Sequence, residues 1–396
     1  ERLRTGTHLG VAGEGSLDQV EKEQQALESE VVGKFDDAMG HVVSEWQDQV
    51  PLALAEMANS RSASGREFVD WDSDSWKVWE APSDGDPAGR FARLEVTLSQ
   101  FVAASPKDSR LCWNVKETLL APLVVNMPLG ESVLFESDGA GPQEVIEAIN
   151  AIVMRLLTTS PVGRMRFTLI DPVGLGQSFA GLMHLTDYDD QLVNRRIWTQ
   201  ASQIEQCLKD LTEHMEKVTQ MYLRNEYETL AEYNEAAGNI AEKYHVLVIA
   251  DFPVGFSESA QRRLQSIAVS GPRCGVFLLV HRDRRQTVLD EAVVDDLREH
   301  GNWFEARANG YQLGGLGWAG VKLNWDRYPD SQAAIDIIHQ VGKASVDSNR
   351  VEVPFSQVVP NTDELWSLET GSTLRVPIGR TGASKLQYLV LGKGTQ

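Results

Sequence analysis

The sequence has few cysteines, no long apolar run and fewer basic than acidic residues. Its three cysteines are Cys112, Cys207 and Cys274, and no two have the spacing of zinc ligands. We therefore expect no metal site and a reducing, cytoplasmic setting. No apolar run is long enough to span a bilayer and nothing after Glu1 reads as a signal peptide, so no membrane contact is expected within this chain.

Basic residues are outnumbered, with 37 Lys and Arg against 57 Asp and Glu, which gives a formal net charge of −20. A surface that grips nucleic acid neutralises phosphates with Lys and Arg, so this composition argues against such a role for the chain as a whole. A local basic patch stays compatible with it. The acidic surface either repels DNA and binds protein, or simply keeps the protein in solution.

The chain divides into five segments by pattern and composition. They are an amphipathic helical or coiled-coil segment (1–58), a linker with a tryptophan motif (59–90), an α/β domain (91–300), a hairpin with a helix (301–349) and a β-rich region (350–396). In the first segment, apolar residues recur every three or four positions over 17–50, and the apolar stripe is narrow. This helix either packs on its own domain or pairs with a partner helix, and Pro51 is expected to kink or restart it.

Three tryptophans stand in the polar linker, Trp71, Trp76 and Trp79. Leaving such side chains in water forfeits their burial, so we expect them to dock in a groove of a neighbouring domain. Stacking on a ligand is the alternative.

Strands and helices alternate through the central segment. Strands are predicted at 132–135, 165–170, 245–250 and 275–280, and helices at 143–158, 201–224 and 257–270. The strands lack polar alternation, which indicates a parallel sheet covered by helices on both faces. A hairpin is predicted over 301–325 and a helix over 331–344.

The loop after the first core strand stands where a nucleotide-binding α/β domain has its phosphate loop, GxxxxGK followed by Ser or Thr. Here residues 136–144 read ESDGAGPQE. Gly139 and Gly141 are in place, but the Lys and the hydroxyl are missing, and Asp138 stands where phosphate charge would sit. Pro142 also removes one N–H from the anion cradle. We interpret the segment as a vestigial loop, beginning at Ser137, that does not bind ATP.

A second element of such a site is an acid at the end of a later strand. Residues 245–252 read HVLVIADF, with Asp251 at the position of a magnesium-binding carboxylate. The next residue is Phe252, where a catalytic Glu would activate water. The alternative is that Asp251 only begins a turn before Pro253.

These motifs make the chain similar to FtsK/SpoIIIE-type translocases, in the HerA/FtsK superfamily, over about residues 125–285. FTLIDPV at 167–173 resembles that family's second-strand motif, and LAEYN at 230–234 resembles a further element. GPRCGVFL at 271–278 is similar to a third, with Arg273 displaced by one position. The resemblance implies a RecA-like P-loop NTPase fold in hexameric motors that use ATP and Mg²⁺ to move DNA or, in secretion relatives, protein. His281 and Arg282 stand where a polar sensor residue is expected.

Residues 374–392 resemble the strands that introduce another ATPase module in multi-module members. We therefore predict that the chain is a piece of a longer protein, cut at its front and followed by an active motor domain. A membrane anchor upstream stays open.

The hypothesis is a non-catalytic module that scaffolds or regulates an adjacent DNA-translocating motor. No catalytic residue and no cofactor is assigned to this chain, while ATP and Mg²⁺ belong to the full-length protein by resemblance. Expected partners are further copies of the chain, the adjacent active module and a partner helix at 17–50, with DNA favoured over protein as the translocated substrate. The alternatives are an active ATPase domain and an interaction adaptor of the type VII secretion ATPase kind. The vestigial nucleotide-binding residues are Ser137, Asp138, Gly139, Gly141, Pro142, Asp251 and Arg273.

Overall fold

The structure is a computed structural model of the 396-residue chain. It describes residues 2–97, 108–111, 118–127, 132–139, 142–224, 226–238, 241–307, 310–315, 321–348, 358–359, 367, 371–381 and 385–392. The chain separates into two compact units. The first comprises Glu1–Ala63 with Leu98–Glu117, and the second comprises Ser64–Thr97 with Thr118–Gln396.

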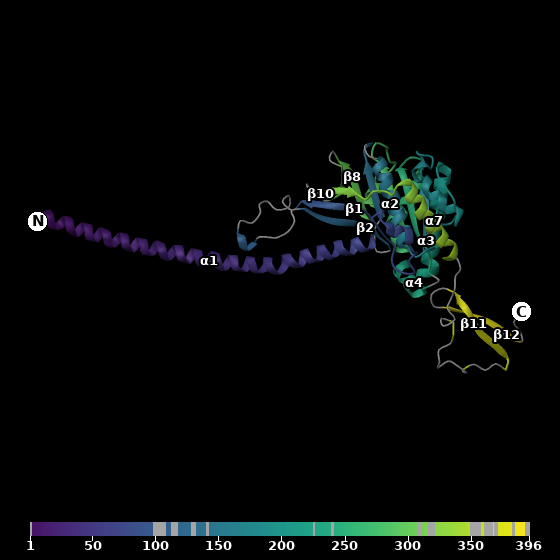
Figure 1. Ribbon diagram of the computed structural model, residues 1–396, viewed down its shortest axis with the longest axis horizontal. Coiled ribbons are helices and arrows are strands. Elements are labelled where there is room, and N and C mark those ends of the chain that lie inside the picture. Colours follow the sequence, from purple (N-terminus) through teal and green to yellow (C-terminus); the bar gives the residue numbers. More distant parts are fainter. Residues whose placement is uncertain are drawn as a thin grey trace. The chain divides into compact units, whose positions relative to one another are not determined.

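The first unit consists mainly of one long helix, α1 (Arg2–Glu67), which the ribbon shows as a continuous coil (Figure 1). The predicted helix at 17–50 is confirmed, but α1 passes through Pro51 and continues beyond the predicted boundary at 58. Arg61, Ala63, Arg66 and Glu67 are residue types that favour a helix, and they outweigh the serines that suggested a linker. Within the residues that the structure describes, no helix combines the length and apolarity needed to cross a membrane.

The second unit holds the remaining α-helices and all of the described strands. Its α-helices are α2 (Pro142–Thr159), α3 (Ala201–Lys217), α4 (Leu230–Ala237), α5 (Glu258–Ser270), α6 (Ala292–Glu299) and α7 (Ser331–Ser348). Its strands are β1 (Ala88–Thr97), β2 (Thr118–Asn126), β3 (Ser132–Ser137), β4 (Met165–Ile170), β5 (Ile197–Trp198), β6 (Tyr244–Phe252), β7 (Val276–Asp283), β8 (Gly301–Arg307), β9 (Gly310–Leu313), β10 (Val321–Trp325), β11 (Thr373–Thr381) and β12 (Lys385–Gly392). Shorter helical turns include η1 (Asp74–Val78), η4 (Gln177–Asp187), the π-helical turn η5 (Val218–Leu223) and η7 (Pro272–Cys274).

The core is a seven-stranded sheet with the order β5-β4-β6-β7-β3-β8-β9. All neighbouring pairs are parallel except β8 and β9, which form an antiparallel hairpin at one edge. Side chains of β6 and β7 are almost completely buried, because helices cover both faces. The predicted α/β fold, a RecA-like P-loop NTPase-type sheet with flanking helices, is confirmed.

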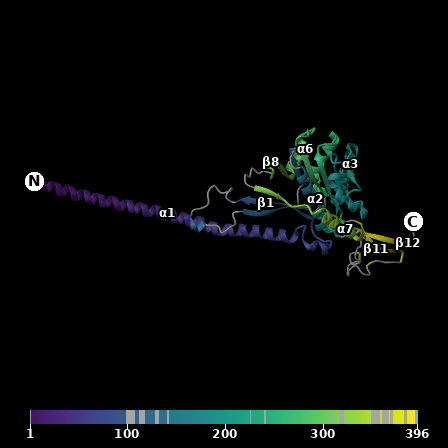
Figure 2. The same cartoon turned by 45° about the horizontal axis from the view of Figure 1, so that its top comes forward.

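The strand order determines which helix covers which face. The chain runs one way across the sheet from β3 to β4 and the other way from β4 to β6, β7 and β8. Right-handed crossovers therefore place α2 on one face and α3, α5 and α6 on the other. Figure 2 shows α3 and α6 on one side of the sheet and α2 with α7 on the opposite side.

A second, antiparallel sheet has the order β10-β1-β2. The prediction of a simple hairpin over 301–325 is therefore wrong in part. β8 and β9 form a hairpin, but β10 leaves them to pair with β1, with Trp325 opposite Ala92. Long-range pairing of this kind leaves no local pattern in the sequence.

α2 lies between the two sheets, in contact with β1 and with β7. Val145, Ile149, Ile152 and Leu156 are all fully buried. This position explains why the helix is apolar around most of its circumference, as the sequence indicated.

The tryptophan segment docks on α2. Trp71 stacks on Trp76 with 4.8 Å between ring centroids, and the Trp79 indole N–H donates a hydrogen bond of 3.2 Å to the Thr158 carbonyl oxygen. The predicted docking of these side chains on the α/β domain is therefore confirmed.

β11 and β12 form an antiparallel hairpin, in which Val376 pairs with Leu389 and Leu374 with Leu391. These four side chains lie on one face of the hairpin and are largely exposed. The first part of the predicted β-rich region, residues 350–357, lies outside the described residues.

Candidate functional site

The candidate site lies where β3, β6 and β7 end at one edge of the sheet. Ser137 pairs with Asp283, and Phe252 pairs with Arg282, so the last residues of the three strands stand side by side. β3 and its neighbour β7 send the chain to opposite faces, which is the position where open α/β sheets bind ligands. The structure thus brings Ser137 and Asp251 together, as predicted.

His281 joins these two predicted site residues. Its Nε2 lies 2.8 Å from the Ser137 Oγ, and its Nδ1 lies 3.2 Å from a carboxylate oxygen of Asp251. The backbone N–H of Asp251 also donates to Nδ1, so the tautomer of the imidazole sets whether Nε2 donates to the serine hydroxyl or accepts from it. Ser137 and His281 are fully buried, while about a quarter of the Asp251 side chain is exposed, at 23%. The polar groups of the site therefore contact each other.

Asp251 has a backbone conformation that few residues other than glycine adopt, with φ +55°. This turns its side chain from β6 toward β7, and its backbone N–H lies 3.3 Å from the His281 Nδ1. The following residue, Phe252, is fully buried and packs edge to face on Phe256. No proton-transferring group stands at that position.

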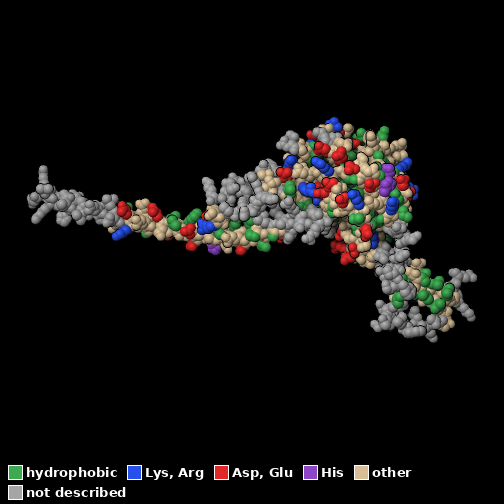
Figure 3. Space-filling model, viewed as in Figure 1, with side chains coloured by type: hydrophobic (Ala, Val, Ile, Leu, Met, Phe, Trp, Pro, Cys, Tyr) green, Lys and Arg blue, Asp and Glu red, His purple; other side chains and the backbone are tan. Residues whose placement is uncertain are grey.

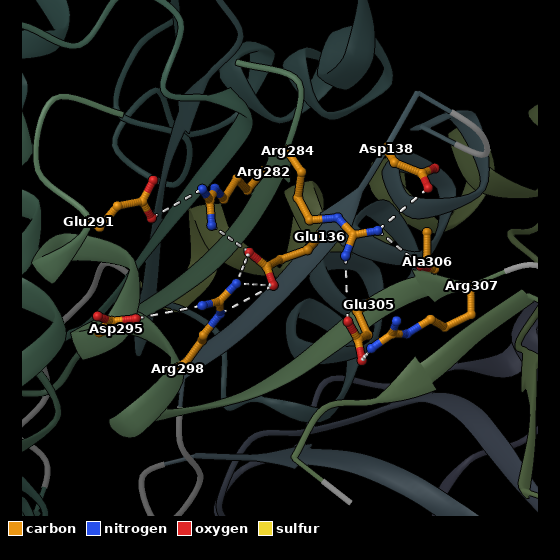
Figure 4. A network of polar contacts seen from close by, with 10 residues as sticks. All are labelled: Glu136, Asp138, Arg282, Arg284, Glu291, Asp295, Arg298, Glu305, Ala306 and Arg307. Atoms are coloured by element: carbon orange, nitrogen blue, oxygen red, sulfur yellow. Dashed lines mark hydrogen bonds and ion pairs between the residues drawn. The ribbon is translucent and has the colours of Figure 1, made fainter. Parts of the chain in front are cut away.

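Two arginines from the end of β7 lie against the loop that follows β3. A side chain at Gly139, whose φ is +95°, would come within 2.5 Å of the Arg285 guanidinium. Arg284 lies 3.5 Å from the Asp138 carboxylate and donates a hydrogen bond of 3.1 Å to the Ala306 carbonyl oxygen (Figure 4). Sequence reasoning missed both cations, although the basic run after β7 was a signal for them.

These cations already have carboxylate partners. Arg285 binds Asp283 through two guanidinium nitrogens, at 3.0 and 2.7 Å. This pairing lowers the pKa of Asp283 and raises that of Arg285. Arg284 lies 3.5 Å from Glu305 as well as from Asp138. The charges of the carboxylates and guanidinium groups around the loop therefore nearly cancel.

A buried ion cluster forms the floor of the loop (Figure 4). Glu136 is fully buried on β3 and accepts hydrogen bonds from Arg282 at 2.7 Å and from Arg298 at 2.9 Å. Glu291 and Asp295 lie at the far sides of the two arginines, at 3.5 and 3.6 Å. The cluster connects β3 to β7 and α6.

Asp171, in the second-strand motif, is buried and shapes a neighbouring loop. Its carboxylate accepts hydrogen bonds from the backbone N–H groups of Gly174, Gly176 and Ser178, at 2.8, 2.9 and 3.0 Å. A side chain at Gly174 would come within 2.6 Å of this carboxylate. Asp171 of this motif therefore stabilises the loop between β4 and η4.

The remaining predicted residues lie apart from this group or are described in part. Arg273 precedes β7, at the opposite edge of the sheet, and donates a hydrogen bond of 2.7 Å to the Glu228 carbonyl oxygen. Pro142 is the first residue of α2, and Gly141 lies outside the described residues. Arg273 thus does not join the other site residues within one chain.

Few described groups are arranged to bind a metal ion. The acidic and histidine ligand atoms of Asp296, Glu299 and His300 lie within 4.8 Å of one another, away from the strand ends. At the strand ends, the carboxylate of Asp251 and the hydroxyl of Ser137 are the oxygen ligands that Mg²⁺ would use. Both groups contact His281.

No protein-family model and no curated protein matches the chain. Among solved structures, it is similar to the pCW3 conjugation coupling protein TcpA in a monomer form with ATPγS, at 13% identity and a TM-score of 0.43, over 56% of this chain and 67% of that one. It is also similar to ATPases 2 and 3 of EssC from Geobacillus thermodenitrificans, at 10% identity and a TM-score of 0.47, over 79% and 60%. For ATPases 2 and 3 of Thermomonospora curvata EccC, in complex with a signal sequence peptide, the values are 13%, 0.42, 81% and 57%.

The chain spans between 57% and 67% of the length of these three solved chains. The likeness to them concerns the fold alone. The assignment of that fold comes from the sheet order of the chain itself.

Proposed function

We propose that this chain is a non-catalytic, ATPase-like module of an FtsK/SpoIIIE-type translocase. In this proposal it scaffolds or regulates an adjacent active motor that moves DNA. The ATP and Mg²⁺ are bound by that motor.

The observation that carries the proposal is the closed set of contacts between Ser137, His281 and Asp251. At 2.8 and 3.2 Å, the imidazole contacts both the hydroxyl and the carboxylate, so a metal ion would have to displace it from both groups. An active site of this fold needs a Lys in the loop, a Ser or Thr on Mg²⁺ and a residue that activates water. The loop has no Lys and no Ser or Thr at the start of the helix that follows it, and buried Phe252 stands in the place of the third.

The charges around the loop also argue against a triphosphate. Each arginine that reaches the loop already binds a carboxylate, Asp138 or Asp283, and these acids would repel phosphate oxygens at close range. Binding would require Arg284 and Arg285 to exchange these partners for the nucleotide.

An active nucleotide site is the second candidate, and one observation favours it. Arg285 lies against Gly139, and its side chain is 62% exposed, so it could swing toward an anion at the loop. Arginine binds phosphate with a fixed, two-pronged geometry and could replace the missing Lys as a cation.

Calorimetric titration of Mg-ATP into the full chain separates the two candidates. We expect no heat of binding at micromolar nucleotide and no phosphate release. The double variant Arg284→Met, Arg285→Met is compared with Arg262→Met, which removes an exposed arginine of α5 that pairs with Glu258. Micromolar binding by the wild type that is lost in the double variant and kept in the control would overturn the proposal.

A further support for a role beside a neighbouring module is the apolar face of the β11–β12 hairpin. Leu374 and Leu391 are 43% and 53% exposed, and Figure 3 shows hydrophobic side chains gathered on this hairpin. Exposed apolar faces of this kind mark interaction surfaces. In our proposal this face contacts the active module that follows.

A further inference from the structure

A cavity of about 400 Å³ lies away from the strand ends, where α2, β1, the tryptophan segment and the segment after β10 meet. Arg155 of α2, Arg90 of β1, Trp71 and Asp326 line its inner part. Exposed Asp72, Arg327 and Asp330 stand at its rim. The cavity belongs to neither the nucleotide site nor the function proposed above.

Arg155 is the unusual group in this cavity. It is only 1% exposed, and its guanidinium lies over the Trp71 ring at 3.8 Å from the centroid. Among the described residues its Nε has no hydrogen-bond partner and no carboxylate lies within ion-pair distance, so Asp326 and Asp70 act on it only at longer range. The Trp71 indole N–H likewise lacks an acceptor.

The nearby carboxylates are already bound to other arginines. Asp326 accepts a hydrogen bond of 2.7 Å from Arg90, and Asp70 binds Arg90 at 3.0 Å and Arg93 at 3.2 Å. Three arginines therefore share two acids at the inner end of the cavity. One positive charge is left without a partner, on the most deeply buried guanidinium.

A buried charge without a partner is costly, and its cost falls when an opposite charge binds it. Burial, and next the neighbouring Arg90, lower the pKa of Arg155 to about 10. The group therefore stays charged near neutral pH.

We propose that this cavity binds a ligand through a carboxylate, which pairs with the Arg155 guanidinium and accepts a hydrogen bond from the Trp71 indole. A guanidinium forms two parallel hydrogen bonds with a carboxylate, and the Trp71 ring holds its plane in place.

The surrounding charges favour a single negative charge over a phosphate. Among the described lining residues, Arg155 is the one buried cation without an ion pair, and Arg327 at the rim is exposed to solvent, while Asp70, Asp72, Asp326 and Asp330 also line the cavity. A dianion would meet these four carboxylates, and Arg155 offers it only one buried positive charge because solvent and salt screen the exposed Arg327, so repulsion would exceed attraction. A carboxylate matches the charge of Arg155.

Acetate and acetamide test the proposal on the unaltered chain, because they have nearly the same shape and differ in charge. The readout is the indole N–H resonance of Trp71, assigned with Trp71→Phe, at constant ionic strength in chloride. We expect acetate to shift this resonance with half-saturation on the order of 10 mM, as for a very small ligand, and acetamide to leave it unchanged. Equal responses to both, or no response to acetate, would overturn the proposal.

Arg155→Met and Arg327→Met form a matched pair of variants, since each removes one arginine of the cavity. We expect Arg155→Met to abolish the acetate response and to be at least as stable as the wild type without acetate, because an apolar side chain replaces a buried charge. Arg327→Met, at the rim, should keep the response. Two results would contradict the assignment. One is an acetate response that Arg155→Met retains, and the other is a lower half-saturation concentration of the wild type for inorganic phosphate than for acetate.

Capped peptides with one Glu or one Gln distinguish the source of the carboxylate. A half-saturation for the Glu peptide far below that of acetate would identify an acidic peptide as the ligand class. A response to acetate alone would identify a small carboxylic acid. Equal binding of the Gln peptide would count against a carboxylate.

Discussion

At the scale of single residues, the strand ends are organised by buried polar pairs, and Glu136 is the centre of the largest. Glu136 is fully buried, the Arg282 side chain is 7% exposed and that of Arg298 is 31% exposed. The other carboxylates beside the two arginines, Glu291 and Asp295, are exposed to solvent and compensate less for a buried charge. The cluster is therefore more sensitive to loss of one partner than an exposed ion pair.

Replacing Glu136 tests this dependence. Glu136→Gln keeps the shape of the side chain but leaves two guanidinium groups without their shared charge. We expect a loss of about 3 kcal/mol in the free energy of unfolding, at the lower end for a broken buried pair because Arg298 is partly exposed. Glu258→Gln, which breaks the exposed pair with Arg262, should change it by less than about 1 kcal/mol in the same urea titration. Equal effects of the two substitutions would show that the cluster is not energetically special.

A second residue-scale feature is the pair of His214 and His245, whose ring centroids lie 4.3 Å apart. Burial lowers the pKa of both, that of His245 well below 6.5, with positive neighbours such as Arg166 and Lys243 adding to the effect. Above the unfolded pKa, near 6.5, both states are neutral and the pair contributes no pH dependence. Below it, the unfolded chain binds protons that the folded chain excludes, so stability falls as the pH falls.

Substituting His245 should therefore flatten this pH dependence. We expect the wild type to lose more stability than His245→Gln between pH 7 and pH 5, by about 1 kcal/mol or more. The measurement is the urea midpoint at both pH values, with exposed His184→Gln as the control. An equal loss of stability in the wild type and in His245→Gln would contradict the burial of His245 as the cause of the pH dependence.

At the scale of elements, the sequence predicted what is determined locally. The strands β3, β4, β6 and β7 and the helices α2, α3 and α5 follow from apolar runs and helical periodicity, and they were predicted within a few residues, whereas α4 was not predicted. The pairing of β10 with β1 was missed, because it depends on contacts between residues far apart in the chain. In the same way, Asp251 and Ser137 were identified from strand ends, while the placement of Arg285 on Gly139 depends on the folded loop.

α1 leaves apolar side chains exposed along one stripe, including Leu27 at 61%, Val31 at 64% and Phe35 at 57%. Burying such side chains is worth about 1.5–3 kcal/mol each, which favours a partner helix. We expect Val31→Asp with Phe35→Asp to lower the oligomeric mass measured by light scattering. Gln25→Asp with Ser29→Asp, on the polar side of the helix, should leave the mass unchanged. An equal mass for both double variants would remove the pairing role of α1.

At the scale of the whole molecule, the net charge indicates which part of a translocase would contact DNA. The formal net charge is −20, and acidic and basic side chains are interspersed over the visible face of the globular unit (Figure 3). DNA affinity depends on the number of phosphates that a protein neutralises, and cations already paired with carboxylates neutralise few. In the proposed translocase, the grip on DNA therefore belongs to the adjacent motor.

DNA binding by the isolated chain is the direct measurement of this assignment. We expect its affinity for a labelled duplex, followed by fluorescence anisotropy, to be weaker than about 10⁻⁴ M at physiological salt and to tighten little at about 50 mM, because few counterions would be released. The double variant Arg284→Glu, Arg285→Glu reverses two charges beside the candidate site and should behave like the wild type. Micromolar binding with a steep salt dependence that this variant abolishes would place a DNA contact at the loop after β3, and with it a role in translocation for this module.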